Sequence, residues 1–274
     1  MTYRRQLEAS FGHLPLEVDD LFLLERFQLL GLPERAPERA LGAVLAADER
    51  LRRFIATRCP ELASWLDAIV DAASDATAED RRALVWELAD LLVDQRFPEA
   101  YDDLQELRWD PAQLAELGEL DGGTIIDAGA GTGWLSVELA RCARTVFAVE
   151  PVGRLREHAR QRAARAGLTN LHTVDGFLHD IPLPAATADV LVTSRAIGWR
   201  LDDELTEIER VVAPGGWAAH FVGTPADMPP SSLDQALLSQ GYVASRYRDG
   251  GGWRRRYAKR IDGPPPPMAG RSPR

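Results

Sequence analysis

Three glycines at alternate positions follow a short apolar run near the middle of the chain. In TIIDAGAGTGWLSVELA, Asp127 ends the apolar run, and Gly129, Gly131 and Gly133 precede a helical stretch. Glycines there let the backbone turn sharply and approach a ligand closely, because they carry no Cβ. A second apolar run ends at Glu150, 23 residues after Asp127, where a carboxylate can accept from both hydroxyls of a ribose. The pattern predicts a nucleoside-cofactor site at the carboxyl ends of two strands.

The spacing of the glycines separates two kinds of nucleoside cofactor. Dinucleotide binding uses G-x-G-x-x-G, whose third glycine lets a helix and a strand pack closely. Counted from Gly129, the third position is Trp134, and counted from Gly131 it is Ser136. These side chains disfavour a dinucleotide, so an NAD-dependent dehydrogenase is kept only as an alternative.

The elements that must position these residues follow a glycine-rich joint at 118–123. Short apolar runs then alternate with helical stretches, which is typical of βαβ units and a parallel sheet. Two polar-apolar runs flank Asp249–Gly252 and predict an antiparallel hairpin. We therefore expect residues 118–262 to form an α/β domain, a Rossmann-like doubly wound and mostly parallel sheet with a C-terminal antiparallel hairpin. The Pro-rich tail 263–274 is expected to be disordered.

Residues 1–117 predict an all-helical domain. Apolar residues recur at helical spacing through 16–32, where Gly31 is a stop signal, and through 40–56 and 81–97. Thr77 and Asp80 form an approximate capping box before the last of these stretches.

The motif G-x-G-x-G, with an acid two residues before its first glycine, resembles motif I of class I S-adenosylmethionine-dependent methyltransferases. Residues 176–194, GFLHDIPLPAATADVLVTS, resemble the family's stretch from its adenine-binding loop to its fourth strand. Residues 207–221, EIERVVAPGGWAAHF, resemble its next helix, turn and fifth strand. The resemblance extends over about 120–260 and implies S-adenosyl-L-methionine as the cofactor.

The same resemblance implies roles for individual residues. The glycine loop would face the methionine part of the cofactor, Asp127 would lie near its ammonium group, and Glu150 would hold the ribose. Ser194 ends the fourth strand and would face the mouth of the site. The implied cofactor-binding residues are Asp127, Gly129, Ala130, Gly131, Gly133, Glu150, Pro151, Phe177, Leu178 and Ser194.

One departure from the family pattern concerns the adenine. Phe177 stands where the family commonly has an acid that meets the adenine amino group. Asp175 and Asp180 are the nearest carboxylates, and Leu178 matches the position whose backbone N–H meets an adenine ring nitrogen. Adenine recognition is therefore expected to rest on the backbone and on apolar packing.

The catalytic residues are left open, because no general base follows the fourth strand. His179 is a candidate for proton removal, Arg195 for anchoring a substrate carboxylate, and Trp199 for a wall of the pocket. Deprotonation is needed only if the acceptor is a protonated oxygen or nitrogen.

Composition restricts the remaining function classes. Hydrophobic residues make up 45% and charged residues 27%, as in soluble globular proteins. No apolar run approaches the ~20 residues of a membrane span. The two cysteines lack metal-site spacing. We expect a cytoplasmic protein without metal. Residues 1–120 contain 13 Arg against 25 Asp and Glu, an acidity that disfavours a nucleic-acid partner.

The sequence thus predicts a methyltransferase that acts from S-adenosylmethionine on an unidentified, small-molecule acceptor. A non-catalytic S-adenosylmethionine-binding module that docks a protein partner remains an alternative. Residues 1–117 are expected to close over the carboxyl ends of the strands and supply the acceptor pocket, because the segments after the fourth and fifth strands are short. The oligomeric state is not predicted.

Overall fold

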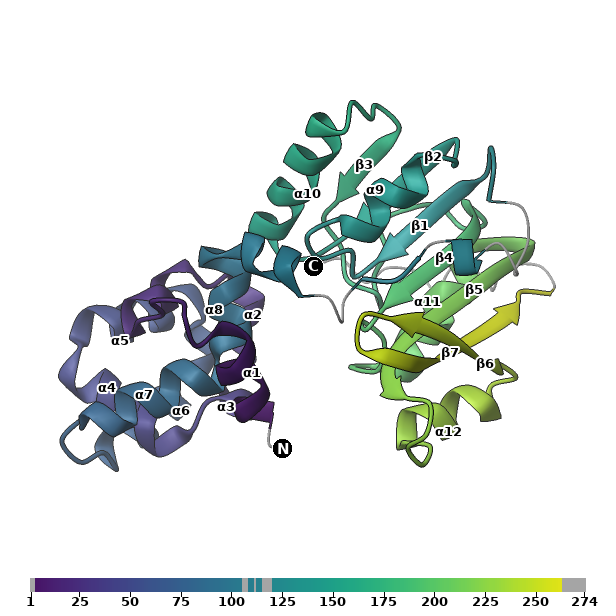
Figure 1. The fold of residues 1–274 in the computed structure, drawn as a ribbon. Helices are drawn as coiled ribbons and strands as arrows, with labels where there is room; N and C mark the ends of the chain where they lie inside the picture. The colour runs from purple at the N-terminus through teal and green to yellow at the C-terminus, as the bar shows by residue number, and fades with distance from the viewer. Residues whose placement is uncertain (1–2, 105–107, 111, 115–119, 263–274) are drawn as a thin grey trace. The chain divides into compact units, whose positions relative to one another are not determined.

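A computed structural model describes residues 3–104, 108–110, 112–114 and 120–262 (Figure 1). The chain divides into two compact units, residues 1–100 and 101–274. The boundary expected at 117/118 and the tail at 263–274 lie outside the described residues.

The described elements of the first unit are all helical, and those from Val18 to Arg96 share one apolar core. Its fully buried side chains include Leu24, Leu41, Leu51, Leu66 and Leu84. The helices are α1 (Tyr3–Phe11), η1 (Val18–Leu23), α2 (Arg26–Leu30), α3 (Leu32–Arg35), α4 (Glu38–Ala47), α5 (Glu49–Arg58), η2 (Pro60–Leu62), α6 (Ala63–Asp71), α7 (Ala78–Glu87) and α8 (Ala89–Arg96), and η3 (Pro98–Asp103) leads into the second unit.

The three long helices expected from periodicity are each broken in two, which corrects the sequence prediction. Asp48 ends α4 and caps α5 by accepting from the N–H groups of Arg50 and Leu51. Leu24 is extended between η1 and α2, and α7 and α8 meet at Leu88. The apolar period continues across each break because both pieces pack against the same core, whereas the caps act locally. The expected Thr77–Asp80 capping box is present.

The second unit is a seven-stranded sheet of order β3-β2-β1-β4-β5-β7-β6. Strands β1 to β5 pair in parallel, and β7 is antiparallel to β5 and β6. The elements are β1 (Thr124–Ala128), α9 (Trp134–Ala140), β2 (Thr145–Val149), α10 (Gly153–Arg165), β3 (Leu171–Val174), β4 (Ala188–Ser194), α11 (Leu201–Val211), β5 (Val212–Pro225), α12 (Ser232–Ser239), β6 (Val243–Asp249) and β7 (Gly252–Arg260). The predicted fold class, including the terminal hairpin, is confirmed.

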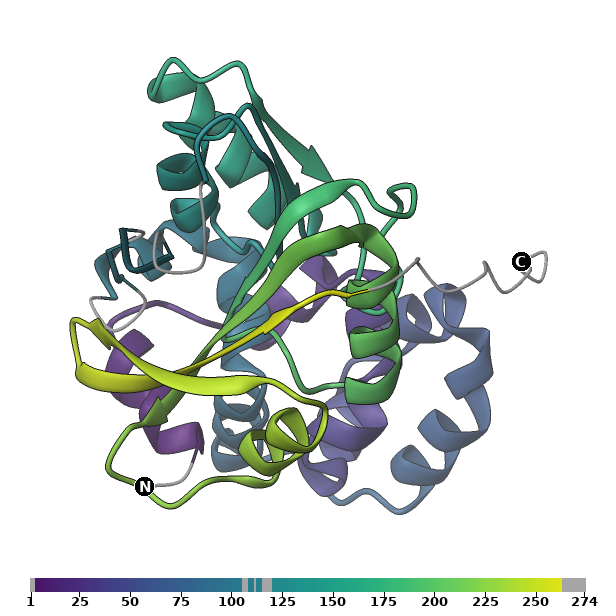
Figure 2. The ribbon, with the colours of Figure 1, turned by 90° about the vertical axis from the view of Figure 1, so that its right-hand side faces the viewer.

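Helices cover both faces of this sheet (Figures 1 and 2). Successive residues of one strand point to opposite faces, so Ile125 joins the core beneath α9 while Ile126 joins the core beneath α11 and α12. The carboxyl ends of β1, β2 and β4, which are neighbours in the sheet, therefore carry the loop residues that the sequence singled out. None of the described helices is long and apolar enough to cross a membrane.

Candidate cofactor site

The glycine loop between β1 and α9 depends on left-handed backbone at three places. Gly129, Gly131 and Gly133 have φ angles of 71°, 54° and 73°. A Cβ at Gly129 would collide with the Cβ of Ala196, and a Cβ at Gly133 would lie 2.5 Å from that of Ala159. These two glycines allow the loop to pack against the segment after β4 and against α10.

Gly131 differs, because a Cβ there would meet no atom within 4 Å. Its open side is thus a place where a ligand can approach the backbone. The end of β2 holds the loop in place, because the Val149 carbonyl accepts from the N–H groups of Gly129 and Ala130 at 2.8 and 3.1 Å.

Glu150 connects the loop to the end of β2. One oxygen of its buried carboxylate accepts from the Gly131 N–H at 2.9 Å, and the other accepts from the Val152 N–H at 3.0 Å. Pro151 lies between Glu150 and Val152 in the sequence. Both oxygens of this carboxylate are thus fixed by backbone N–H groups, and one of these groups belongs to the glycine loop.

Asp127 is a carboxyl group buried in β1, with 1% of its surface exposed. It accepts a 2.5 Å hydrogen bond from the Ser136 hydroxyl on α9. Burial raises its pKa to about 7 and the nearby charge of Glu150 adds to this, although the bond from Ser136 acts in the opposite direction. No basic side chain in the described residues forms an ion pair with it. A cationic ligand would therefore stabilise its charged form.

The loop between β3 and β4 holds the residues aligned with the adenine. The Phe177 ring stacks on His179, with centroids 5.2 Å apart, and Leu178 is buried. Asp175 is exposed and forms a 3.0 Å ion pair with Arg156. The Asp180 N–H donates to the Phe177 carbonyl at 3.0 Å, which closes a tight turn.

The residues at the end of β4 and after it are mostly held by contacts with residues that are distant in the sequence. Ser194 accepts from the Trp109 indole N–H at 3.2 Å. Arg195 has a φ of 59° and donates at 2.9 Å to Asp249, whose side chain is fully buried. Trp199 is 76% exposed, in a loop whose N–H groups at Gly198, Trp199 and Arg200 donate to the Glu204 carboxylate at 2.7–3.1 Å.

These contacts bear on the three catalytic candidates. Arg195 is engaged with the terminal hairpin, His179 stacks on Phe177 within the adenine-aligned loop, and Trp199 is exposed. Their catalytic roles stay predictions. Within the described part of the chain, no group of three or more His, Cys, Asp and Glu side chains can hold a metal ion.

Sequence reasoning missed the segment that precedes β1. The Trp109 ring stacks on Phe221 with centroids 3.7 Å apart, and the Arg108 carbonyl accepts from the Gly250 N–H at 3.2 Å. The available signal was an aromatic residue directly before Asp110-Pro111, a pair that suits the start of a helix, because an apolar residue before an N-cap often packs back onto the fold. This signal does not show that Trp109 stacks on Phe221.

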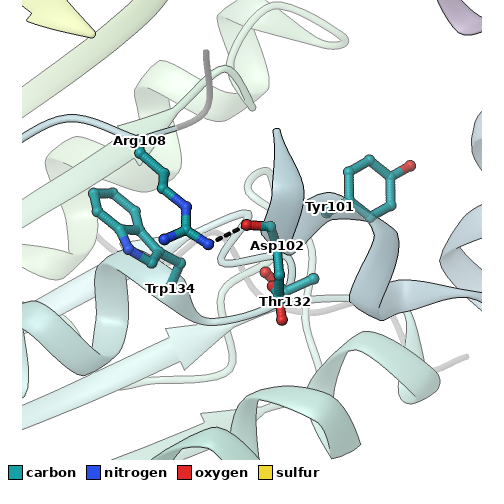
Figure 3. A pocket seen from close by; sticks show the side chains of 5 residues that line it. All are labelled: Tyr101, Asp102, Arg108, Thr132 and Trp134. Atoms are coloured by element: carbon teal, nitrogen blue, oxygen red, sulfur yellow. Dashed lines mark hydrogen bonds between the residues drawn. The ribbon is translucent and has the colours of Figure 1, made fainter. Parts of the chain in front are cut away.

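A small pocket lies beside the glycine loop (Figure 3). It is lined by Tyr101, Asp102, Arg108, Thr132 and Trp134. Trp134, whose bulk in place of a glycine disfavours a dinucleotide, forms one of its walls.

Comparison with known proteins finds a similarity to methyltransferases within this unit. Residues 125–216, about a third of the chain, match a family model described as a methyltransferase domain. Over 125 residues the chain is 30% identical to a malonyl-[acyl-carrier protein] O-methyltransferase of Yersinia pestis, covering 44% of this chain and 45% of that protein. Over 97 residues it is 33% identical to the enzyme of that name from Serratia marcescens, covering 35% and 36%.

The chain thus aligns with less than half the length of these two curated relatives. A solved structure of a SAM dependent methyltransferase from Aquifex aeolicus covers 60% of this chain and 96% of its own, with 22% identity and a TM-score of 0.49. The region matched by the family model begins in β1 and ends in β5, so residues 125–216 are similar to a methyltransferase domain.

Proposed function

We propose that this protein transfers the methyl group of S-adenosylmethionine to a small-molecule acceptor. The observation that carries the proposal is the glycine loop, in which Gly131 has open space where a Cβ would stand and donates its N–H to the fixed carboxylate of Glu150. The proposal includes a cytoplasmic location and an acceptor other than nucleic acid.

The site residues fit this cofactor chemically. The Glu150 carboxylate is the acceptor for ribose hydroxyls, and Asp127 provides the charge that an ammonium group requires. Phe177 and the Leu178 backbone are assigned to the adenine. Ala130, Pro151 and Ser194 complete the set of proposed contacts. Each assignment follows from position at the carboxyl ends of β1, β2, β3 and β4.

S-adenosylmethionine supplies a methyl group on a positively charged sulfur, which leaves as a neutral thioether. The protein must therefore hold the acceptor in line with the S–CH₃ bond and exclude water, and such alignment can account for ~7–11 kcal/mol of a barrier. An acceptor oxygen that carries no proton, such as a carboxylate, needs no general base. The curated relatives are named for methylating a malonyl group, and malonyl-[acyl-carrier protein] is one acceptor to assay.

Residues 1–117 are proposed to supply the acceptor pocket. The connections from β4 to α11 and from β5 to α12 each span six residues, 195–200 and 226–231, too few to enclose a substrate. The test is a truncated protein that begins at residue 101, since Arg108 and Trp109 belong to the second unit. It should bind cofactor and transfer no methyl group, and full turnover by this protein would overturn the assignment.

Calorimetry and turnover together test the proposed function. The full chain should bind S-adenosylmethionine and should label an acceptor in a lysate of the producing cell when given methyl-labelled cofactor. Binding without any labelled acceptor would favour the non-catalytic module. Ligand at 100 times its dissociation constant stabilises a protein by ~2.7 kcal/mol. A thermal shift with NAD or NADP and none with S-adenosylmethionine would favour the dehydrogenase.

A further inference from the structure

The buried side of α9 carries a polar side chain among apolar ones. Leu135, Leu139 and Ala140 of this helix pack into the core on that face of the sheet, and Ser136 lies among them with 0% of its surface exposed. A hydroxyl group in an apolar interior is unfavourable unless it forms a hydrogen bond. The burial of Ser136 therefore depends on a specific partner, which an apolar side chain at the same position would not need.

That partner is Asp127 of β1. The Ser136 hydroxyl donates to Oδ2 of the Asp127 carboxylate at 2.5 Å, and both side chains are buried. The hydrogen bond joins the first turn of α9 to the strand beneath it. Because this bond is made to Oδ2, the Oδ1 atom can accept from a different donor.

The surroundings of Asp127 otherwise disfavour its charge. Its register partners are Ala148 on β2 and Val192 on β4, and both are apolar and buried. Burial raises the pKa of Asp127 to about 7, the Ser136 hydroxyl acts against this, and the nearby charge of Glu150 adds to it. The Ser136 backbone N–H also lowers this pKa. Ser136 thus opposes the two influences that would keep Asp127 protonated.

We propose that Ser136 is a positioning residue for the cofactor. Its hydroxyl keeps the Asp127 carboxylate ionised and fixed, so that Oδ1 accepts from the ammonium group of S-adenosylmethionine. The inference rests on the proposed function, because that ammonium group belongs to the cofactor. A hydrogen bond between two charged groups is about twice as strong as one between neutral groups, so the protonation state of Asp127 decides how tightly the ammonium is held.

The test is calorimetry with S-adenosylhomocysteine, which keeps the ammonium group and carries no transferable methyl group. Wild type and Ser136→Ala are compared from pH 6 to pH 8.5. Without the hydroxyl, Asp127 should take up its proton at a pH ~1 unit higher. Ser136→Ala should therefore bind less than ~2-fold more weakly at pH 8.5 and ~10-fold more weakly at pH 6.

The shape of this profile separates positioning from simple packing. If Ser136 only fills space on α9, Ser136→Ala should lose the same factor of affinity at every pH. That result would overturn the proposal, and so would equal affinities of the two proteins across the whole range.

Two further variants show whether the effect acts through Asp127. In Asp127→Asn, which carries no titratable group at this position, adding Ser136→Ala should change the affinity by less than ~3-fold at any pH. A ~10-fold loss in that background would contradict the proposal. Ser239→Ala is the matched control, because its hydroxyl donates to the Ala236 carbonyl on the exposed side of α12, and it should leave the profile unchanged. Thermal unfolding shows that each variant compared is folded.

A measurement without ligand separates this proposal from the proposed function. In protein labelled with ¹³C at aspartate carboxyl carbons, the signal absent from Asp127→Asn belongs to Asp127, and its titration gives the pKa directly. The pKa should be ~1 unit higher in Ser136→Ala than in the wild type, and an unchanged pKa would overturn the proposal. If the wild type binds neither S-adenosylhomocysteine nor S-adenosylmethionine, the proposed function fails, and the assigned role of Ser136 toward the ammonium fails with it.

Discussion

The glycine loop after β1 and the segment after β4 hold their residues by different means. The loop is built from backbone geometry, with three positive φ angles within five residues and carbonyl contacts to the adjacent β2. The segment after β4 is held by side chains from distant parts of the chain, Trp109 on Ser194 and Asp249 on Arg195. The first kind of site is visible in a short sequence motif, whereas the second requires the folded structure.

This difference predicts where substitutions affect cofactor affinity. Substitutions in the loop should lower the affinity for the cofactor directly, whereas substitutions at the hairpin should lower the stability of the folded protein. The following variants are ordered by their expected effect on the affinity for S-adenosylmethionine.

Gly131→Val should have the largest effect, a loss of binding of at least ~100-fold. The side chain would occupy the open side of the loop, and a β-branched residue is strained at a φ of 54°. Gly122→Val is the matched control, because Gly122 has a φ of 71°, lies just before β1, and has equally open space where a Cβ would stand. Calorimetry on both decides the matter, and equal affinities would refute the assignment of the loop.

Glu150→Gln should weaken binding by ~1.5–3 kcal/mol, the scale of hydrogen bonds to a charged acceptor. The amide oxygen can still accept from the Gly131 N–H, which keeps this contact to the loop, whereas the amide NH₂ group cannot accept from the Val152 N–H. Glu138→Gln on the exposed part of α9 is the control. Unchanged affinity in Glu150→Gln would mean that the ribose is held elsewhere.

Asp127 should make binding depend on pH. With a pKa of about 7 in the free protein, the carboxyl group is protonated below pH 7, and an ammonium ligand favours its charged form. Affinity should therefore fall by up to ~10-fold per pH unit as the pH decreases below 7. Calorimetry between pH 5.5 and 7.5 measures this, and Asp127→Asn should give a flat profile. A wild-type profile as flat as that of the variant would argue against an ammonium at this carboxyl.

The same group should affect the stability of the free protein. Its pKa is raised on folding from the ordinary 3.8, so the folded state binds more protons than the unfolded state between pH 4 and 7. Stability is then lost as the pH rises through this range, by up to ~4 kcal/mol. Asp127→Asn should stabilise the protein at pH 8 and have little effect at pH 4, as measured by urea unfolding. Stabilisation that is equal at both pH values would contradict the raised pKa.

Asp249→Asn should leave cofactor affinity within about threefold of the wild type while lowering stability by ~3 kcal/mol. The substitution removes the buried charge that pairs with Arg195 and Arg254. Thermal unfolding and calorimetry separate the two effects. A large loss of affinity without a loss of stability would place Arg195 in the cofactor site and remove the contrast between the two segments.

The sheet, the hairpin and the capping box could be predicted because each has a local signal in the sequence. The glycine spacing and the alternation of apolar runs indicated the sheet, because parallel strands buried on both faces are uniformly apolar. The hairpin followed from Asp249–Gly252, and the Thr77–Asp80 box from cap chemistry. The breaks at Leu24, Asp48 and Leu88 were missed, because periodicity reports which face is buried rather than where a helix stops.

The pocket could not be predicted for a different reason. Arg108 and Trp134 come from separate segments, and the capture of Asp102 by Arg162 and His158 depends on how α10 crosses the loop. No sequence spacing encodes these contacts. Residues 108–110 and 112–114 are held beside β6, where the Arg248 N–H donates to the Gln113 side chain at 2.8 Å.

The central claim is that the loop after β1 holds the cofactor, and amide hydrogen exchange tests it most directly. Saturating S-adenosylmethionine should slow exchange in peptides that span Gly129–Trp134 and Glu150–Val152, and leave the β6–β7 hairpin unchanged. Protection confined to the hairpin or to residues 1–100, with the glycine loop exchanging as fast as in the free protein, would contradict the account.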